Sequence, residues 1–210
     1  MKVSLKTLLI AVLSGISVHM NAQSGVLGAE GLQAGSKHLF MDVHNLGAGK
    51  VKLAAVAQAH ARDLAVQDKY GVQFVKYWVD EKKGLIFCLA SANDSELIRM
   101  AHKEAHGLLP SRIYPVSGEV ATSLKGNQNL FLDVHLLGPG VSPNDVAGAH
   151  QKDLAVQGKY GVNISNYWLD QKDGVVMCLA EAKDSASLIK THKEAHGLVP
   201  AKVYQVKQGQ

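Results

Sequence analysis

With 210 residues, the chain is long enough to form two small domains that each have a hydrophobic core. Its 47% of hydrophobic and 19% of charged residues are typical of a globular protein and exclude disorder along the whole chain. The formal net charge is +4, and without residues 1–22 the chain keeps 20 basic and 18 acidic side chains. This near balance, with no basic stripe interleaved with aromatic residues, gives no electrostatic case for binding nucleic acid or an anionic membrane.

The N-terminal segment has the three-part layout of a secretory signal. Two lysines precede an apolar run at residues 7–18, and Ala22 offers a small residue at the cleavage position. The run is short for a membrane span, so an N-terminal anchor is the less favoured alternative. We therefore expect a signal peptide at 1–22, a flexible leader at 23–37, and a mature protein that is periplasmic or secreted and free of the membrane.

The rest of the chain is a tandem duplication. We place the first repeat at residues 38–117 and the second at 129–209, joined by a linker at 118–128. Whole motifs return in the same order, among them Asp-Leu-Ala-Val-Gln, Lys-Tyr-Gly-Val, Tyr-Trp and His-Lys-Glu-Ala-His-Gly-Leu. A period of about ninety residues corresponds to a whole domain, so we expect two similar domains rather than a solenoid.

Within the first repeat, the hydrophobic period changes from strand to helix and back. Four short segments rich in β-branched and aromatic residues predict strands: 39–44, 72–79, 85–90 and 113–116. Two segments with helical periodicity predict helices: 51–70, ended by Gly71, and a second helix capped by Asp94 or Ser95 and ended by Gly107. On the first helix, Val56, His60 and Leu64 are expected to face the core. The order βαββαβ predicts an α+β ferredoxin-like sandwich in each repeat, and we expect the two sandwiches to be arranged as a pseudo-dimer, which the resemblance described below implies.

This topology gathers four histidines of each repeat at one end of the sheet. His44 ends the first strand, and His102 and His106 lie four residues apart on one face of the last turns of the second helix. The fourth histidine is His60, on the core-facing side of the first helix. The counterparts in the second repeat are His135, His150, His192 and His196.

Four imidazoles at one pole predict a metal site, because buried imidazoles are costly unless their nitrogens are satisfied, and one ion satisfies several. Each repeat has a full set, so we predict two equivalent sites per chain and one site in an isolated second repeat. Asp63 and Asp42 are candidates for orienting the histidines rather than for binding the ion, and Glu104 is expected to be a solvated helix residue. Zinc, copper, iron and nickel all suit imidazole ligands.

The two cysteines, Cys88 and Cys178, occupy matched positions within predicted strands. We expect two buried thiols, and a disulfide across the pseudo-twofold axis is the alternative. No nucleophile or catalytic residue is predicted, so we favour a binding protein. A metal-dependent enzyme of oxygenase or hydrolase type on the same histidines, and an unmetallated hydrogen-bonded cluster, remain the alternatives.

Each repeat resembles the small SCO-type nickel-binding domain, a family of domains of unknown function. The motifs that carry the resemblance are Asp63-Leu64-Ala65-Val66-Gln67, Lys69-Tyr70-Gly71-Val72, Tyr77-Trp78, His102-x-Glu104-Ala105-His106-Gly107 and their second copies. The resemblance implies a ferredoxin-like fold, nickel as the ion, and a dimer of single domains that this chain builds within itself; further homo-oligomers stay open. The imidazole ligands themselves leave zinc or copper possible. We therefore expect an exported binder of divalent transition metals that serves sequestration, delivery or sensing.

Overall fold

The computed structural model describes residues 37–120 and 123–210, so the predicted signal peptide and most of the leader lie outside the described residues. The predicted βαββαβ order is confirmed in both repeats. The first repeat consists of β1 (His38–Asn45), α1 (Leu53–Val66), β2 (Gln73–Asp80), β3 (Leu85–Ala92), α2 (Ser95–Ala105) and β4 (Arg112–Val120). The second repeat consists of β5 (Asn129–Leu136), α3 (Pro143–Val156), β6 (Asn163–Asp170), β7 (Val175–Ala182), α4 (Ser185–Ala195) and β8 (Lys202–Gly209).

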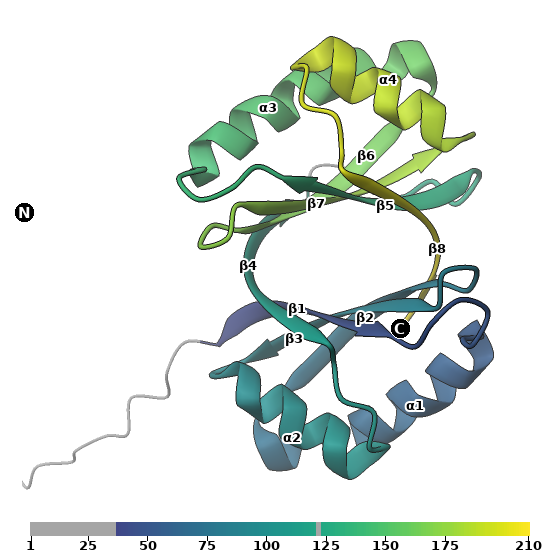
Figure 1. Ribbon diagram of the computed structural model, residues 1–210, viewed down its shortest axis with the longest axis vertical. Helices are drawn as coiled ribbons and strands as arrows, with labels where there is room; N and C mark the ends of the chain where they lie inside the picture. The colour runs from purple at the N-terminus through teal and green to yellow at the C-terminus, as the bar shows by residue number, and fades with distance from the viewer. Residues whose placement is uncertain (1–36, 121–122) are drawn as a thin grey trace, which may run out of the picture. The chain divides into compact units, whose positions relative to one another are not determined.

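The eight strands form one closed barrel, in the order β1-β3-β2-β8-β5-β7-β6-β4. Within each repeat the strand order is that of a ferredoxin-like sheet, and every strand pair is antiparallel. The sheets join because β8 pairs with β2 and β4 pairs with β6, as Figure 1 shows. Each repeat therefore covers an edge strand of the other, which leaves no unpaired edge in the barrel.

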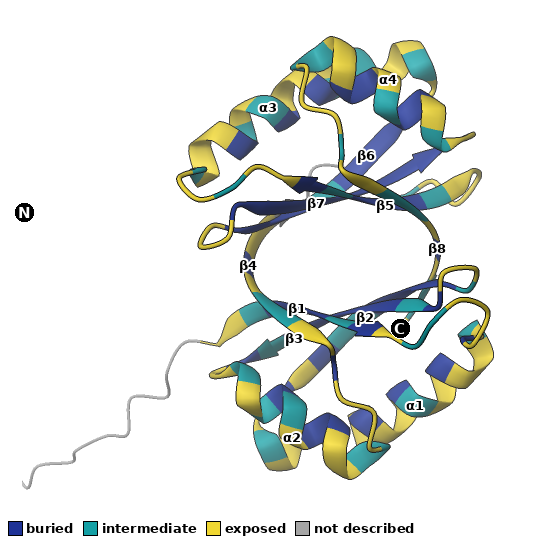
Figure 2. Ribbon diagram, in the orientation of Figure 1, coloured by how far each residue is buried: buried dark blue, intermediate teal, exposed yellow. Residues whose placement is uncertain are grey.

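Two kinds of core follow from the alternation of side chains along the strands. One face of each strand points into the barrel, where Trp78 packs on Trp168 with ring centroids 5.1 Å apart. The other face is covered by helices, α1 and α2 over the first repeat and α3 and α4 over the second (Figure 1). Figure 2 shows the resulting pattern, with buried strands and helices that are exposed on their outer sides. No helix in the described ranges has the length and apolar character needed to cross a membrane.

The connection between the repeats is partly regular structure. β4 extends to Val120, into the segment that the sequence suggests as a linker, and Gly118 pairs with Trp168 of β6. A side chain at Gly118 would lie 2.4 Å from the carbonyl oxygen of Tyr167, so this crossing requires a glycine. Beyond residues 121–122, the backbone amides of Lys125 and Gly126 donate hydrogen bonds to the buried carboxylate of Glu181, at 2.7 and 2.5 Å. The connection between the repeats is thus attached to the second repeat both before residue 121 and after residue 122.

The first helix faces the sheet with a different set of residues from the one predicted. Val56 and His60 are buried as expected, but Leu64 is 41% exposed and the neighbouring Asp63 is buried instead. The predicted last turns form a separate 3-10 helix, η1 (Gln67–Tyr70), which ends at Gly71. The inward position of Asp63 has a physical cause, since its carboxylate contacts two histidines of α2.

Candidate metal centre

The strand β1 supplies two polar side chains to the helix-covered face of the sheet. Asp42 and His44 alternate with Met41 and Val43, which face the barrel, so both polar groups point towards the helices. Opposite Asp42 on β3 lies Cys88. The turn after β1 is fixed by Gly84, because a side chain there would lie 1.8 Å from the carbonyl oxygen of Gly47.

The helix α2 supplies the other two histidines from its C-terminal end. Asp94 caps the helix as predicted, accepting a hydrogen bond from the backbone amide of Glu96 at 2.7 Å. His106 is the C-cap, and Gly107 follows with a left-handed φ of 77°. This glycine turns the chain away while both histidines face β1, since residues four apart share one helical face.

Three imidazoles and two carboxylates form a continuous chain of contacts in each repeat, in which the two kinds of group alternate. We call it the histidine–aspartate cluster. In the first repeat, the order is His44, Asp42, His102, Asp63, His106, with nitrogen–oxygen distances of 3.1, 3.4, 2.9 and 3.1 Å. In the second repeat, the order is His135, Asp133, His192, Asp153, His196, with distances of 3.0, 3.2, 3.0 and 3.1 Å. The five side chains of the first cluster are each at most 5% exposed.

The central histidine of each cluster is an imidazolium at neutral pH. Burial by itself lowers the pKa of an imidazole, because it penalises the charged form. Hydrogen bonds and charge attraction from Asp42 and Asp63 outweigh burial and raise the pKa of His102 to about 9. The equivalent aspartates of the second repeat outweigh burial in the same way and raise the pKa of His192 to about 10.

The aspartates of each cluster are ionised. Burial raises the pKa of a carboxyl group, but the adjacent histidines outweigh it and hold the pKa values of Asp42 and Asp63 below the usual value. His192 and His196 lower the pKa of Asp153 to about 2, again against the effect of burial. The two carboxylates place negative charge in the buried interior of each cluster, which favours a bound cation.

One buried carboxylate oxygen of each cluster lacks a well-aligned hydrogen-bond donor. No donor reaches the Oδ1 of Asp42 with good hydrogen-bond geometry, although the Nε2 of His44 is only 3.1 Å away. The Oδ1 of Asp133 stands in the same relation to His135, at 3.0 Å. Two donor atoms that are close but not aligned with each other are suited to share one cation, which would explain the unsatisfied oxygen.

The donor set follows from these contacts. Asp63 accepts a hydrogen bond from the Nδ1 of His102 and so orients the ring with its Nε2 towards Asp42. A carboxylate behind a ligating histidine is a recurrent arrangement in metal sites. In the second repeat, the donor atoms of Asp133, His135 and His192 all lie within 4.8 Å of one another, as do those of Asp153, His192 and His196. In the first repeat, the groups that meet this distance are Asp42, His44 and Cys88, and Asp63, His102 and His106. By analogy with the second repeat, Asp42, His44 and His102 are the candidate ligands of the first.

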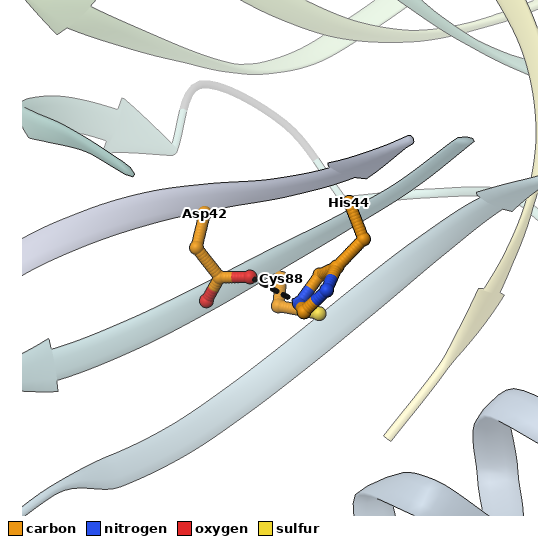
Figure 3. A group of neighbouring side chains, drawn as sticks. All are labelled: Asp42, His44 and Cys88. Atoms are coloured by element: carbon orange, nitrogen blue, oxygen red, sulfur yellow. Dashed lines mark ion pairs between the residues drawn. The ribbon is translucent and has the colours of Figure 1, made fainter. Parts of the chain in front are cut away.

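Cys88 lies beside this donor set. Its sulfur is within 4.8 Å of donor atoms of Asp42 and His44. Figure 3 shows the three side chains as neighbours. Burial raises the pKa of the Cys88 thiol well above its usual value, as it does for Cys178. Both thiols are buried and free, so the expectation of buried thiols is confirmed and the alternative of a disulfide is wrong.

His60 is near the cluster but outside it. Its ring centroid is 4.9 Å from Tyr77 and 6.4 Å from Phe74. Within the described ranges, it belongs to none of the groups whose donor atoms lie within 4.8 Å of one another. Burial lowers its pKa and keeps the imidazole neutral. His150 packs on Tyr167 in the same manner, with centroids 5.0 Å apart.

A cavity adjoins each cluster, and all four predicted histidines of a repeat line it. The cavity of the first repeat has a volume of about 190 Å³ and that of the second about 320 Å³. The histidines concerned are His44, His60, His102 and His106 in the first repeat, and His135, His150, His192 and His196 in the second. The structure thus brings together the residues that the sequence suggested, and their role as ligands stays a prediction.

Both halves of the chain match the family described as nickel responsive protein SCO4226-like, over residues 40–116 and 131–206. The chain belongs to this nickel-responsive family. The two matches confirm that it contains tandem copies of the family's domain. All ten residues of the two histidine–aspartate clusters lie within the matched ranges.

Several solved structures are similar to this chain of the SCO4226-like family. SCO4226 from Streptomyces coelicolor A3(2) is 28% identical, and the match covers 39% of this chain and 99% of that one with a TM-score of 0.37. Chlorite dismutase from Candidatus Nitrospira defluvii is 7% identical, with 84% and 91% covered and a TM-score of 0.47. A heme-binding protein from Thermus thermophilus is 12% identical, with 83% and 92% covered and a TM-score of 0.41. None of the curated proteins compared with the chain matches it.

The sequence suggested the aspartates only as groups that orient the histidines, and it predicted Glu104 as a solvated helix residue. The spacing of Asp42 and His44 on one strand face was a usable signal, but the pairing of Asp63 with a helix 39 residues away was not visible. Glu104 is exposed, as predicted, and on the surface it accepts hydrogen bonds from Lys69, at 2.5 Å, and from the hydroxyl of Tyr70. These contacts, repeated at Glu194, attach the motif-bearing helix to the 3-10 turn.

Proposed function

We propose that the protein is an exported binder of divalent transition metal ions, with nickel as the first candidate and zinc or copper as alternatives. Its role would be sequestration, delivery or sensing of the ion. The observation that carries the proposal is the histidine–aspartate cluster, built twice from buried groups with one carboxylate oxygen unsatisfied in each. Membership of a nickel-responsive family supports nickel among the ions that nitrogen and oxygen donors suit.

In each repeat the three donors play different parts. Asp42 supplies the negative charge and an oxygen donor, and His44 and His102 supply imidazole nitrogens. Because His102 is protonated in the metal-free protein, an ion that binds its Nε2 must displace a proton. The Nδ1 of His102 keeps its proton, which it donates to Asp63, and this hydrogen bond holds the ring in place. Binding should therefore release at least one proton per site and strengthen as the pH rises.

The stoichiometry of the full chain tests the proposal. Elemental analysis of protein purified without a histidine tag should find two nickel ions per chain after loading, one for each cluster. His44→Ala should remove one ion and so should His135→Ala, and the double variant should bind none. His38→Ala is the control, because His38 is exposed at the start of β1 and has Asn129 as its counterpart. Full loading of the double variant would show that the clusters are not the sites.

The export part of the proposal needs its own test. Expression of the full chain in a bacterial host, followed by fractionation and N-terminal sequencing, should give a periplasmic protein that begins at Gln23. A cytoplasmic protein with an intact N-terminus would contradict export and leave the metal sites untouched.

One observation favours the second candidate, a metal-dependent enzyme of oxygenase or hydrolase type. Two histidines and one carboxylate, as in Asp133, His135 and His192, are the donor set of non-haem iron oxygenases, and a cavity adjoins them. Exposure of the ferrous-loaded protein to nitric oxide should then give the electron paramagnetic resonance signal of an iron nitrosyl. No such signal would favour a binding protein without an open coordination position.

A further inference from the structure

The two cavities differ although the clusters beside them are alike. The cavity of the second repeat, at about 320 Å³, exceeds the 190 Å³ of the first. Val176 lines the larger cavity at the position where Ile86 lines the smaller one. Lys50, which lines the smaller cavity, has no counterpart in the second repeat, where Val141 follows Gly140 directly. Against these two reductions, Asp145 replaces the smaller Ala55 in the wall. The second repeat therefore has room beside its cluster that the first repeat fills with its own side chains.

The wall of the larger cavity combines apolar side chains with the polar groups of the cluster. Its apolar lining consists mainly of Leu137, Val141, Val146, Val176 and Leu198. Of these, Leu198 is 44% exposed and Leu137 is 36% exposed. The polar lining includes the four histidines of the repeat and the carboxylates of Asp145 and Asp153. A cavity lined by apolar side chains with a few polar groups is the usual form of a site for a small organic molecule.

The volume of the cavity and the charges beside it limit the class of molecule that the cavity can bind. A dry apolar cavity of about 150 Å³ holds one benzene molecule, so about twice that volume admits an aromatic ring with a further group attached. The carboxylates of the cluster and of Asp145, which also lines the cavity, disfavour an anion. Three protein donors fill fewer positions than the roughly four to six that divalent transition metals take, so the ion can accept a further donor.

We propose that the cavity of the second repeat binds a small neutral organic molecule with an apolar body and one nitrogen donor, which coordinates the ion held by Asp133, His135 and His192. The inference rests on the proposed metal binding and goes beyond it, because it makes the two sites of the chain unequal. Metal binding and binding of the organic molecule would also be linked. If the molecule binds the metal-loaded second site more tightly than the metal-free site, it must raise the affinity of that site for the metal by the same factor.

The test uses phenylimidazole as the probe and imidazole as its control, since the two share the donor and differ in the apolar body. Nickel content of the full chain is measured first, and the probes are then titrated into the nickel-loaded protein by calorimetry. Phenylimidazole should bind at one site per chain and at least about tenfold more tightly than imidazole, because its ring is buried in the cavity. Equal affinities in a protein that holds two nickel ions would overturn this inference alone, whereas absence of nickel would overturn the proposed function.

Matched variants locate the site. Ala149 lines the second cavity and Ala59 lines the first at the equivalent place, and both are half-buried. Ala149→Leu should weaken phenylimidazole at least about tenfold, and Ala59→Leu should leave its affinity unchanged. Val176→Ile is a second test. The first repeat already has an isoleucine, Ile86, at the equivalent position, so the fold should tolerate the change. This variant should also lower the affinity for phenylimidazole. Equal effects of the two alanine variants would show that the probe does not occupy the second cavity.

Discussion

The charge state of the central histidines predicts how the stability of the metal-free protein varies with pH. His102 and His192 have pKa values raised from 6.5 to about 9 and to about 10 in the folded chain. Between about pH 6.5 and 9, the folded state therefore holds protons that the unfolded state has lost, so the free energy of unfolding must fall as the pH rises. The contribution is fully present below about pH 6.5 and is lost as the pH rises through the folded-state values.

The size of this effect follows from the shifts. One pKa unit corresponds to about 1.4 kcal/mol, so the shift of His102 amounts to on the order of 3 kcal/mol, and His192 contributes an effect at least as large. Up to about pH 9, the two histidines together should lower the free energy of unfolding by roughly 3 kcal/mol for each pH unit. Unfolding by urea, followed by the fluorescence of the buried Trp78 and Trp168, measures this in protein treated with a chelator.

Control variants separate the clusters from other titrating groups. The double variant His102→Gln with His192→Gln should lose most of the slope, whatever its absolute stability. Saturating nickel should also remove the loss of stability, because the ion replaces the proton on each central histidine. A wild-type stability that stays flat or rises between about pH 7 and 9 would refute the assignment of the two imidazolium ions.

Three further outcomes are expected. Nickel at a hundredfold excess over its Kd should raise the free energy of unfolding by about 2.7 kcal/mol for each site, and an unchanged melting temperature after verified uptake would contradict binding to the folded state. His106→Ala should weaken nickel binding in its own repeat more than His38→Ala does, because His106 contacts the aspartate that orients His102, and calorimetry giving equal affinities would speak against it. Trp78→Ala should lower the free energy of unfolding by about 3–5 kcal/mol, since the side chain is 2% exposed in the barrel core. Its nickel content should stay at two ions, and loss of an ion would mean that core and site are not independent.

The sequence predicted the fold well because the signals were local. The duplicated motifs, the change of hydrophobic period and the capping residues at Asp94 and Gly107 each act within a few residues of the chain. The pairing of β4 with β6 is different, since Gly118 to Val120 has the composition of a linker and becomes a strand only against its partner. Because its partner strand belongs to the other repeat, this segment shows no hydrophobic periodicity that would predict a strand.

The candidate site was predicted in outline, and the aspartates show why the rest was missed. On a helical wheel Asp63 and Leu64 lie side by side, and transfer energies place the leucine inside. The structure turns the helix by one position because the buried carboxylate of Asp63 contacts His102 and His106. A buried charge is stable only with its partners, and the partners come from an element that is distant in sequence.

The closure of the barrel has a consequence for how the chain acquires its structure. β8 comes last of the described strands, and its residues Lys207–Gly209 pair with Tyr77–Val79 of β2. The side chain of Gln208 also accepts a hydrogen bond from the indole of Trp78, at 3.0 Å. Until β8 has left the ribosome, β2 is therefore an open edge beside an uncovered apolar sheet, which is the form of strand that pairs with other chains. Contacts across about 130 residues also slow folding, so the edge of β2 stays open to pairing with other chains until β8 docks.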